Sequence, residues 1–200
     1  MRPIYLLPVL AVLLAGCTPL PARATPTPVP TATPDPRVEE NAVFAALFQG
    51  MVDPQVRQLV VEDHTTPFGT SDWEQLSQYI QQNMPDLAQE TLDDYRARNA
   101  EPMPLTDYLS LPIPFALISE QERNEIFQTS GSGWDEFYRR YPNSSGLTSI
   151  SRVGFNPGHT QAFVYIGTQS HYLAGAGFYV LLVRENGTWK VTSQVMAWIS

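Results

Sequence analysis

Residues 177–199 read GFYVLLVRENGTWKVTSQVMAWI, and this stretch decides the fold. Asn186 and Gly187 lie between two hydrophobic segments. Both residue types accept the positive φ angles of a type I′ turn, which joins the two strands of a tight hairpin. We therefore expect antiparallel strands at 177–184 and 188–199.

The two strands of this hairpin differ in their hydrophobic pattern. Residues 178–183 are apolar throughout, which is typical of a central strand covered on both faces. The second strand alternates between an apolar set and a polar set, which are Trp189, Val191, Val195 and Ala197 against Lys190, Thr192 and Gln194. This alternation predicts that one face of the second strand is buried and that the other faces water.

Two further strands are expected before the hairpin. Residues 147–155 and 161–167 are strand-like in composition, and the turn formers Asn-Pro-Gly-His at 156–159 separate them. The C-terminal part of the chain therefore predicts a four-stranded antiparallel meander.

The part of the chain before this meander has mainly helical patterns. Apolar residues at helical spacing or capping boxes predict helices at 41–51, 71–84, 86–99, 119–127 and 134–141, and short apolar runs predict strands at 57–63 and 115–118. The expected fold class is α+β, with helices packed on a twisted antiparallel sheet.

Composition and charge narrow the functional classes. The chain has 200 residues, 43% of them hydrophobic, which is enough for a core of ordinary size. From residue 38 the composition is globular, and 38–200 has the length of one domain. The net charge of −8 argues against a nucleic-acid partner, because such proteins carry a basic surface. A single cysteine excludes a disulfide framework and a multi-cysteine zinc site.

The first residues, MRPIYLLPVLAVLLAGC at 1–17, have the layout of an export signal. Arg2 precedes an apolar run, 4–14, which is too short to cross a membrane as a helix. The segment 14–17, Leu-Ala-Gly-Cys, resembles the lipobox of bacterial lipoproteins and ends at the only cysteine.

The lipobox resemblance implies a signal peptide at 1–16, cleavage before Cys17 and attachment of lipid, palmitate included, to the Cys17 thiol. The alternative is an ordinary secretory signal that is cut near Ala15 or Ala22. Residues 17–37 then form a stalk, because the segment is rich in proline and threonine and cannot build a core. As an extended polyproline-like chain, about 19 of these residues reach roughly 60 Å at about 3.1 Å per residue.

The C-terminal third of the chain resembles a family of exported bacterial proteins without an assigned activity. The resemblance is carried by 134–141, by SRVGFN at 151–156, by AFVYIG at 162–167 and by YVLLVRENGTWKV at 179–191. It implies no catalytic residues. Some members carry cysteines in the loop that corresponds to 168–176, where this chain has none, so a disulfide role does not apply. The closing Gly-x-Trp-Lys-Val segment is also similar to the last hairpin of cystatin-like and NTF2-like folds.

The segment 167–177, GTQSHYLAGAG, is the first candidate binding site. We expect it to be a loop between two apolar strands, and loops on a rigid sheet often carry binding groups. Gln169, His171 and Tyr172 are its candidate contacts, and its glycines would let a ligand approach the backbone. The alternative is a mobile loop without a binding role.

Arg152, in the interior of the expected strand 147–155, is the second candidate. An arginine on a sheet face can hold a carboxylate or phosphate through two parallel hydrogen bonds. The more ordinary alternative is an ion pair with an acid of the protein itself, such as Asp135 or Glu136.

Patterns for metal binding and catalysis are weak. Glu62, Asp63 and His64 are consecutive, but strand alternation directs Asp63 away from the other two. The serines at 130–132 and 144–145 lack the G-x-S-x-G pattern of a hydrolase nucleophile. We therefore assign no metal ligand, no catalytic residue and no cofactor.

Together these patterns predict an exported protein that is anchored by lipid to a cell membrane and faces the extracytoplasmic side. Its domain would bind a small ligand or an envelope protein without catalysis, and nucleic acid is not an expected partner. Two alternatives remain open. One is a hydrolase-like enzyme of the cell envelope, in which His171, Tyr172 or Arg152 meets an acid of the helical half. The other is a structural or assembly component.

Overall fold

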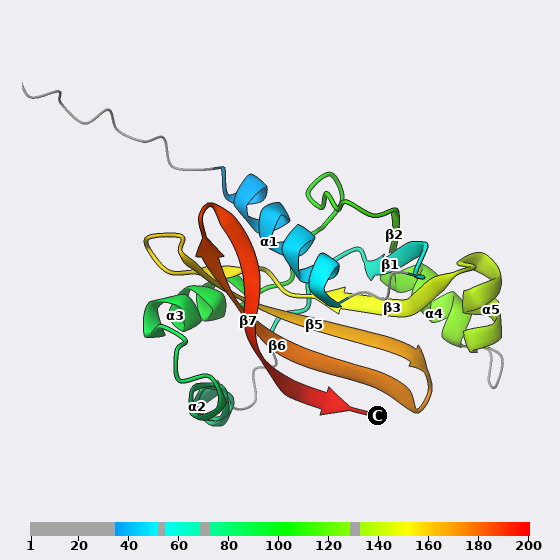
Figure 1. Cartoon of the computed structure of the whole chain (residues 1–200). Helices are drawn as coiled ribbons and strands as arrows, with labels where there is room; N and C mark the ends of the chain where they lie inside the picture. The colour runs from blue at the N-terminus through cyan, green and yellow to red at the C-terminus, as the bar shows by residue number, and fades with distance from the viewer. Residues whose placement is uncertain (1–34, 52–54, 69–72, 129–132) are drawn as a thin grey trace, which may run out of the picture. The chain divides into compact units, whose positions relative to one another are not determined.

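The computed structural model of the chain describes residues 35–200 apart from 52–54, 69–72 and 129–132 (Figure 1). The expected signal peptide, Cys17 and all but the end of the stalk lie outside these residues, as does the start of the capping box at 71–74. The described residues form α1 (Pro36–Met51), β1 (Gln58–Glu62), α2 (Trp73–Asn83), α3 (Gln89–Arg98), β2 (Phe115–Ile118), α4 (Glu120–Phe127), α5 (Gly133–Arg140), β3 (Ser144–Ile150), β4 (Gly154–Phe155), β5 (Gln161–His171), β6 (Ala174–Glu185) and β7 (Thr188–Ile199). None of the helices in this part of the chain is long and apolar enough to cross a membrane.

The strands form one sheet in the order β2-β1-β3-β5-β6-β7, and β4 pairs beside β5. The strands β3, β5, β6 and β7 are antiparallel neighbours, so the expected α+β class and the C-terminal meander are confirmed. The sheet as a whole is mixed, because β1 pairs in parallel with both β2 and β3. Parallel neighbours require long crossovers, and here the connections that carry α2 with α3 and α4 with α5 provide them.

The β6–β7 hairpin has the expected turn, with φ angles of 51° at Asn186 and 83° at Gly187. The alternation expected along β7 holds only in part. The register between β6 and β7 shifts near Leu181, and Val191, expected to be buried, is 36% exposed. Such a shift accommodates an extra residue in one strand and re-aims the side chains that follow it.

The two faces of the sheet bury different clusters of side chains. On one face, α1 packs against β5 and β6, and this cluster contains Phe44, Val164 and Leu182. The intervening residues of the same strands, among them Phe163 and Leu181, point to the other face and pack against α2 and α3. The apolar run of β6 is thus covered on both sides, as its sequence predicts.

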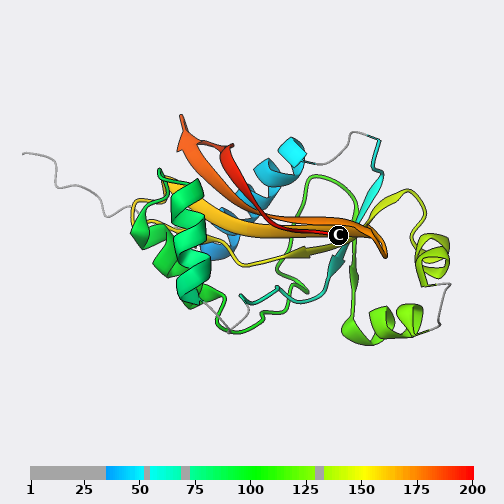
Figure 2. The same cartoon turned by 90° about the horizontal axis from the view of Figure 1, so that it is seen from below.

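A third cluster lies on the same face as α2 and α3 but at the other end of the sheet. It joins Val60 of β1 to Ile126 of α4 and to Trp134 and Phe137 of α5. Neighbouring residues of β1 belong to the α1 side, which places Val60 on the opposite face. Figures 1 and 2 show the pair α2 and α3 and the pair α4 and α5 at opposite ends of the sheet. The middle of this face therefore lies between two helical pairs.

Candidate functional site

In the middle of that face, β5 and β6 carry glycines in place of larger residues. We call this part of the sheet surface the floor. Gly167 and Gly177 are directly paired across the two strands. A Cβ atom on Gly177 would overlap the indole ring of Trp198, and one on Gly167 would lie 2.5 Å from the hydroxyl of Tyr165 and 2.9 Å from Oγ of Ser149. The absence of a side chain at Gly177, and at Gly175 on the same strand, lets the indole ring of Trp198 pack directly against β6.

A cavity of about 320 Å³ lies over this floor. Its aromatic lining comes from Phe127, Trp134, Tyr172 and Trp198, and its polar lining includes Glu62, Arg123, Ser149 and Gln169. The walls thus come from α4, α5, the β5–β6 turn and β7, and the floor comes from the central strands. Apolar walls with a few convergent polar groups are typical of a small-molecule site.

Two more cavities adjoin the first and share residues with it. One, of about 460 Å³, shares Glu62 and Arg123. The other, of about 260 Å³, shares Trp198, and these two outer cavities have Thr66 and Pro67 in common. We call the three together the trough.

The charged groups of the trough form two pairs, and Glu120, which also lines it, has no ion pair among the described residues. Arg123 Nη1 lies 2.7 Å from Glu62 Oε1, and His64 Nδ1 lies 2.7 Å from Asp63 Oδ1. The Glu62 and Arg123 side chains are 24% and 38% exposed, so the pair is in contact with solvent. Among the described residues, no group of three histidine, cysteine or acidic side chains is placed to hold a metal ion.

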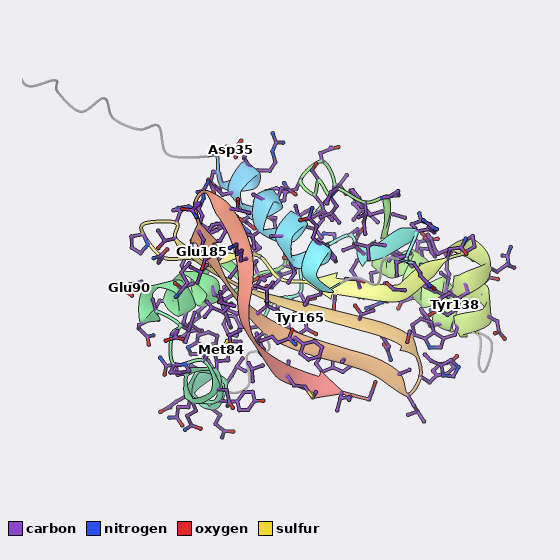
Figure 3. The ribbon with its side chains drawn as sticks, in the orientation of Figure 1. Asp35, Met84, Glu90, Tyr138, Tyr165 and Glu185 are labelled. Atoms are coloured by element: carbon purple, nitrogen blue, oxygen red, sulfur yellow. The ribbon has the colours of Figure 1, made fainter. Side chains whose placement is uncertain are left out.

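Hydrogen bonds and ring contacts fix the aromatic side chains around the trough. Trp198 Nε1 donates to the Tyr165 hydroxyl at 2.7 Å. Tyr172 packs edge-on against Trp134, with 6.4 Å between ring centroids. Figure 3 shows Tyr165 on the sheet and Tyr138 on α5, where the Tyr138 hydroxyl donates to the Ser170 carbonyl at 2.8 Å. Burial raises the pKa of Tyr138, so this hydroxyl stays a donor at neutral pH.

The segment 167–177, expected to be a loop, is a β-hairpin in the structure. β5 continues to His171 and β6 begins at Ala174, so only Tyr172 and Leu173 form the turn. The loop prediction is wrong because glycines and short side chains, which suggest a loop by composition, here allow close packing of Trp198. Gln169 and Tyr172 do line the trough, whereas His171 stacks on Trp134 at 6.4 Å and an interplanar angle of 21°.

Arg152 lines none of the three cavities of the trough. It belongs to the link between β3 and β4 rather than to a strand interior, and its Nη2 lies 2.5 Å from Glu40 Oε1 of α1. An ion pair within the protein is therefore confirmed, but the expected partners are wrong. Glu136 binds Arg139 and Arg140 of its own helix instead.

Glu40 is the centre of a buried polar cluster. Its side chain is fully buried, accepts a hydrogen bond from Arg98 Nη1 at 3.0 Å as well as that from Arg152, and also accepts from the Val153 backbone N–H at 3.3 Å. Burial and the neighbouring Glu40 raise the pKa of Tyr108 to about 12. Arg152 and Glu40 line none of the trough cavities, and we assign this cluster a structural role.

Another cavity, of about 390 Å³, opens on the α1 face of the sheet. Its lining includes Phe48, Leu59, Ile166 and Phe178, together with short hydroxyl side chains. Thr148 is one of these; it is 1% exposed, and its Oγ1 has no hydrogen-bond partner among the described residues. Among the described residues, its lining has no charged side chain and no tryptophan or tyrosine, in contrast to the trough.

Sequence reasoning missed several trough residues. The sequence patterns assign no binding role to Trp134, Trp198 or Arg123, which all line the central cavity. One signal was available. Gly167 and Gly177 stand at the facing ends of two strands in the expected meander, which indicates a place where a large side chain can approach the backbone.

Comparison of the chain with protein-family models, with curated proteins and with solved structures finds no match.

Proposed function

We propose that this protein is an exported lipoprotein, anchored to a membrane through Cys17, whose domain binds a ligand in the trough without transforming it. The anchor rests on the leader, on the lipobox at 14–17 and on the single cysteine. Two or more acyl chains suffice for stable anchoring, whereas one is marginal. The stalk then holds the domain away from the membrane surface.

The observation that carries the binding role is the continuity of the trough. Three cavities share lining residues in pairs, over a floor from which side chains are missing. Keeping glycines in the middle of strands costs about 0.5–1 kcal/mol each relative to alanine. At Gly177 and Gly167 the close approach of Trp198 and of Tyr165 accounts for this cost, so the glycines shape the floor of the trough.

The hydrolase-like alternative has less support. It requires an activated nucleophile, with a serine or similar group within hydrogen-bond reach of a base. In the described part of the chain, no serine hydroxyl is hydrogen-bonded to a histidine, and the hydroxyls of Ser77, Ser144, Ser151 and Ser170 donate to backbone carbonyls. Arg152 does meet an acid of the helical half, Glu40, but in the interior rather than in a cavity.

Lipidation is tested by labelling cells that express the full chain with a palmitate analogue. We expect label on the wild-type protein and none on Cys17→Ala, with the protein moving from the membrane fraction to the soluble or secreted fraction. Label that persists on the variant would contradict the anchor.

Ligand binding is tested by thermal unfolding of the purified full chain against metals, neutral sugars, nucleotides, peptides and lipid head groups. A ligand that binds the folded state should raise the melting temperature, and more so at a higher dose. In a protein of this size, the rise is about 3 °C for each kcal/mol by which binding stabilises the folded state. The shift should be lost in Gln169→Ala, which alters the trough. It should be kept in the matched variant Gln194→Ala, whose glutamine is exposed on β7. No shift with any class, or equal shifts in both variants, would contradict a ligand site in the trough.

A further inference from the structure

The trough has a specific chemistry, and from it we infer that the ligand is a neutral glycan chain. This inference rests on the proposed function, since it names the class of ligand for the same site. Three properties of the trough support it, namely its paired charges, its accessible aromatic rings and its length.

Internal pairing of the charges favours an uncharged ligand. Glu62 is neutralised by Arg123, and Asp63 is hydrogen-bonded to His64. Glu120 also lines this end of the trough, so an anionic ligand would meet three carboxylates against one arginine. A cationic ligand would have to compete with Arg123 for Glu62 and with His64 for Asp63, and of the three carboxylates only Glu120 would be open to it. A neutral ligand meets neither cost.

The aromatic side chains suit a ring that has an apolar face. Tyr172 is 46% exposed, and Trp198 and Phe127 are half-buried at the edge of the cavity. The face of an aromatic ring carries partial negative charge, which attracts the partially positive C–H groups of a pyranose ring. Aromatic rings on different walls, and a floor of glycine, let such a ring lie flat.

The polar side chains between these rings suit hydroxyl groups. The amide of Gln169 has no hydrogen-bond partner among the described residues and offers both donors and an acceptor. Arg123 binds Glu62 through Nη1, and its guanidinium carries further N–H donors. Planar groups of this kind bind pairs of neighbouring hydroxyls, which sugars present along the edge of the ring.

The length of the trough indicates a chain of several sugar units. The central cavity of about 320 Å³ is flanked by cavities of about 460 and 260 Å³ that share lining residues with it. Affinity should therefore increase from a monosaccharide to an oligosaccharide and then level off once the trough is filled.

The experiment is calorimetric titration of the full chain in a zwitterionic detergent that has no sugar head group. The probes are neutral hexasaccharides of glucose, N-acetylglucosamine, mannose and galactose, with the hexamer of galacturonic acid as the anionic counterpart and hexalysine as the cationic one. We expect at least one neutral hexasaccharide to bind at least tenfold more tightly than its monosaccharide, and the acidic hexamer and hexalysine not to bind.

Two neighbouring residues of the β5–β6 turn provide matched variants. Tyr172→Ala should weaken hexasaccharide binding at least tenfold, because Tyr172 lines the trough. Leu173→Ala should bind like the wild type, because Leu173 is 84% exposed and does not line the central cavity. Equal affinity in both variants would place the glycan elsewhere and overturn the inference.

The other outcomes separate the inference from the proposed function. Binding of hexalysine or of the acidic hexamer that is sensitive to Tyr172→Ala, with no neutral hexasaccharide bound, overturns the glycan and leaves a trough ligand of another class. A melting-temperature shift by a nucleotide or lipid head group that Gln169→Ala removes has the same meaning. Absence of binding by every probe in both experiments overturns both.

Discussion

Thr148 is a residue whose environment does not match its chemistry. It lies in β3, is 1% exposed and faces the cavity on the α1 side with an unpartnered hydroxyl. A buried polar group without a partner costs folding free energy, because it loses its hydrogen bonds to water and gains none.

Replacing this hydroxyl by a methyl group should stabilise the protein. We expect Thr148→Val to raise the free energy of unfolding by about 1 kcal/mol, because valine has nearly the same shape and no polar atom. The measurement is the urea midpoint at an unchanged slope. Thr168→Val is the control; it is paired with Thr148 across β3 and β5 but is half-exposed, and should change little. A loss of stability in Thr148→Val would mean that the hydroxyl has a partner.

Among the elements, α1 adds a buried carboxylate to its hydrophobic packing on the sheet. Glu40 is fully buried, while its partners Arg98 and Arg152 have side chains that are 23% and 21% exposed. Glu39, one residue earlier, binds Arg184 at 3.3 Å, and that arginine is 35% exposed. The two neighbouring acids therefore make pairs in different surroundings.

Neutralising each acid tests this difference. Glu40→Gln should lower the free energy of unfolding by about 3 kcal/mol, because it leaves the partly buried guanidinium of Arg152 without a counter-ion and Arg98 with Asp94 alone. Glu39→Gln should cost less than about 1 kcal/mol, as expected for a pair in contact with solvent. Both are read from urea unfolding. Equal effects of the two substitutions would contradict the central position of Glu40.

The end of α5 should respond to acid through Glu136. Hydrogen bonds from Arg139, and next from Arg140, lower the pKa of Glu136 from 4.5 to about 2. A carboxylate with a lowered pKa in the folded state stabilises the protein above its unfolded pKa, and this contribution is lost as the pH falls toward the folded pKa. The free energy of unfolding should therefore decrease more steeply between pH 4.5 and pH 2 in the wild type than in Glu136→Gln. Parallel pH profiles would show that the ion pairs do not form in solution.

Most helices and strands could be predicted from local sequence patterns. Which strands pair, and which side chains form ion pairs, could not. The i, i+3, i+4, i+7 aromatic spacing predicts the buried face of α5, which carries Trp134 and Phe137. The Ser119 hydroxyl accepts from the Glu122 backbone N–H, as its capping box predicts. Pairing of β1 with strands on both sides depends on contacts between residues that are far apart in sequence, which no local pattern records. The same reason hides Glu40 as the partner of Arg152.

The whole molecule should lose stability in alkali through its buried tyrosines. Burial, and next the nearby Tyr165, raise the pKa of Tyr179 from 10.0 to about 12, and burial raises that of Tyr95 further. A group with a raised pKa stabilises the folded state below its unfolded pKa, and this contribution is lost as the pH rises through the folded pKa. The free energy of unfolding should decrease between pH 10 and pH 12.

The alkaline prediction is checked by following tyrosinate absorbance together with near-ultraviolet circular dichroism. Exposed tyrosines should ionise first, and the buried ones only as the fold is lost. Tyr179→Phe should make the decrease in stability less steep. A wild-type protein in which all tyrosines ionise together near pH 10 with its fold intact would contradict this account.

At the scale of the molecule, the site could be predicted only in part. Gln169 and Tyr172 were candidates from the sequence, and both line the trough. The trough itself arises where β1, the glycines of β5 and β6, and Trp198 of β7 meet between two helical pairs. Such a meeting depends on the register of the whole sheet, and a shift of one residue would send each side chain to the other face.

The most direct test of the central claim, a ligand bound in the trough, is a nuclear magnetic resonance titration of the full chain labelled with ¹⁵N in its four tryptophans. The ligand is the neutral hexasaccharide that binds most tightly. Trp198, whose indole N–H donates to Tyr165 at the trough, should show the largest shift. Trp189, which is buried in the α1 cluster on the opposite face, should not move. A shift of Trp189 without Trp198, or no indole shift at saturation, would contradict the account.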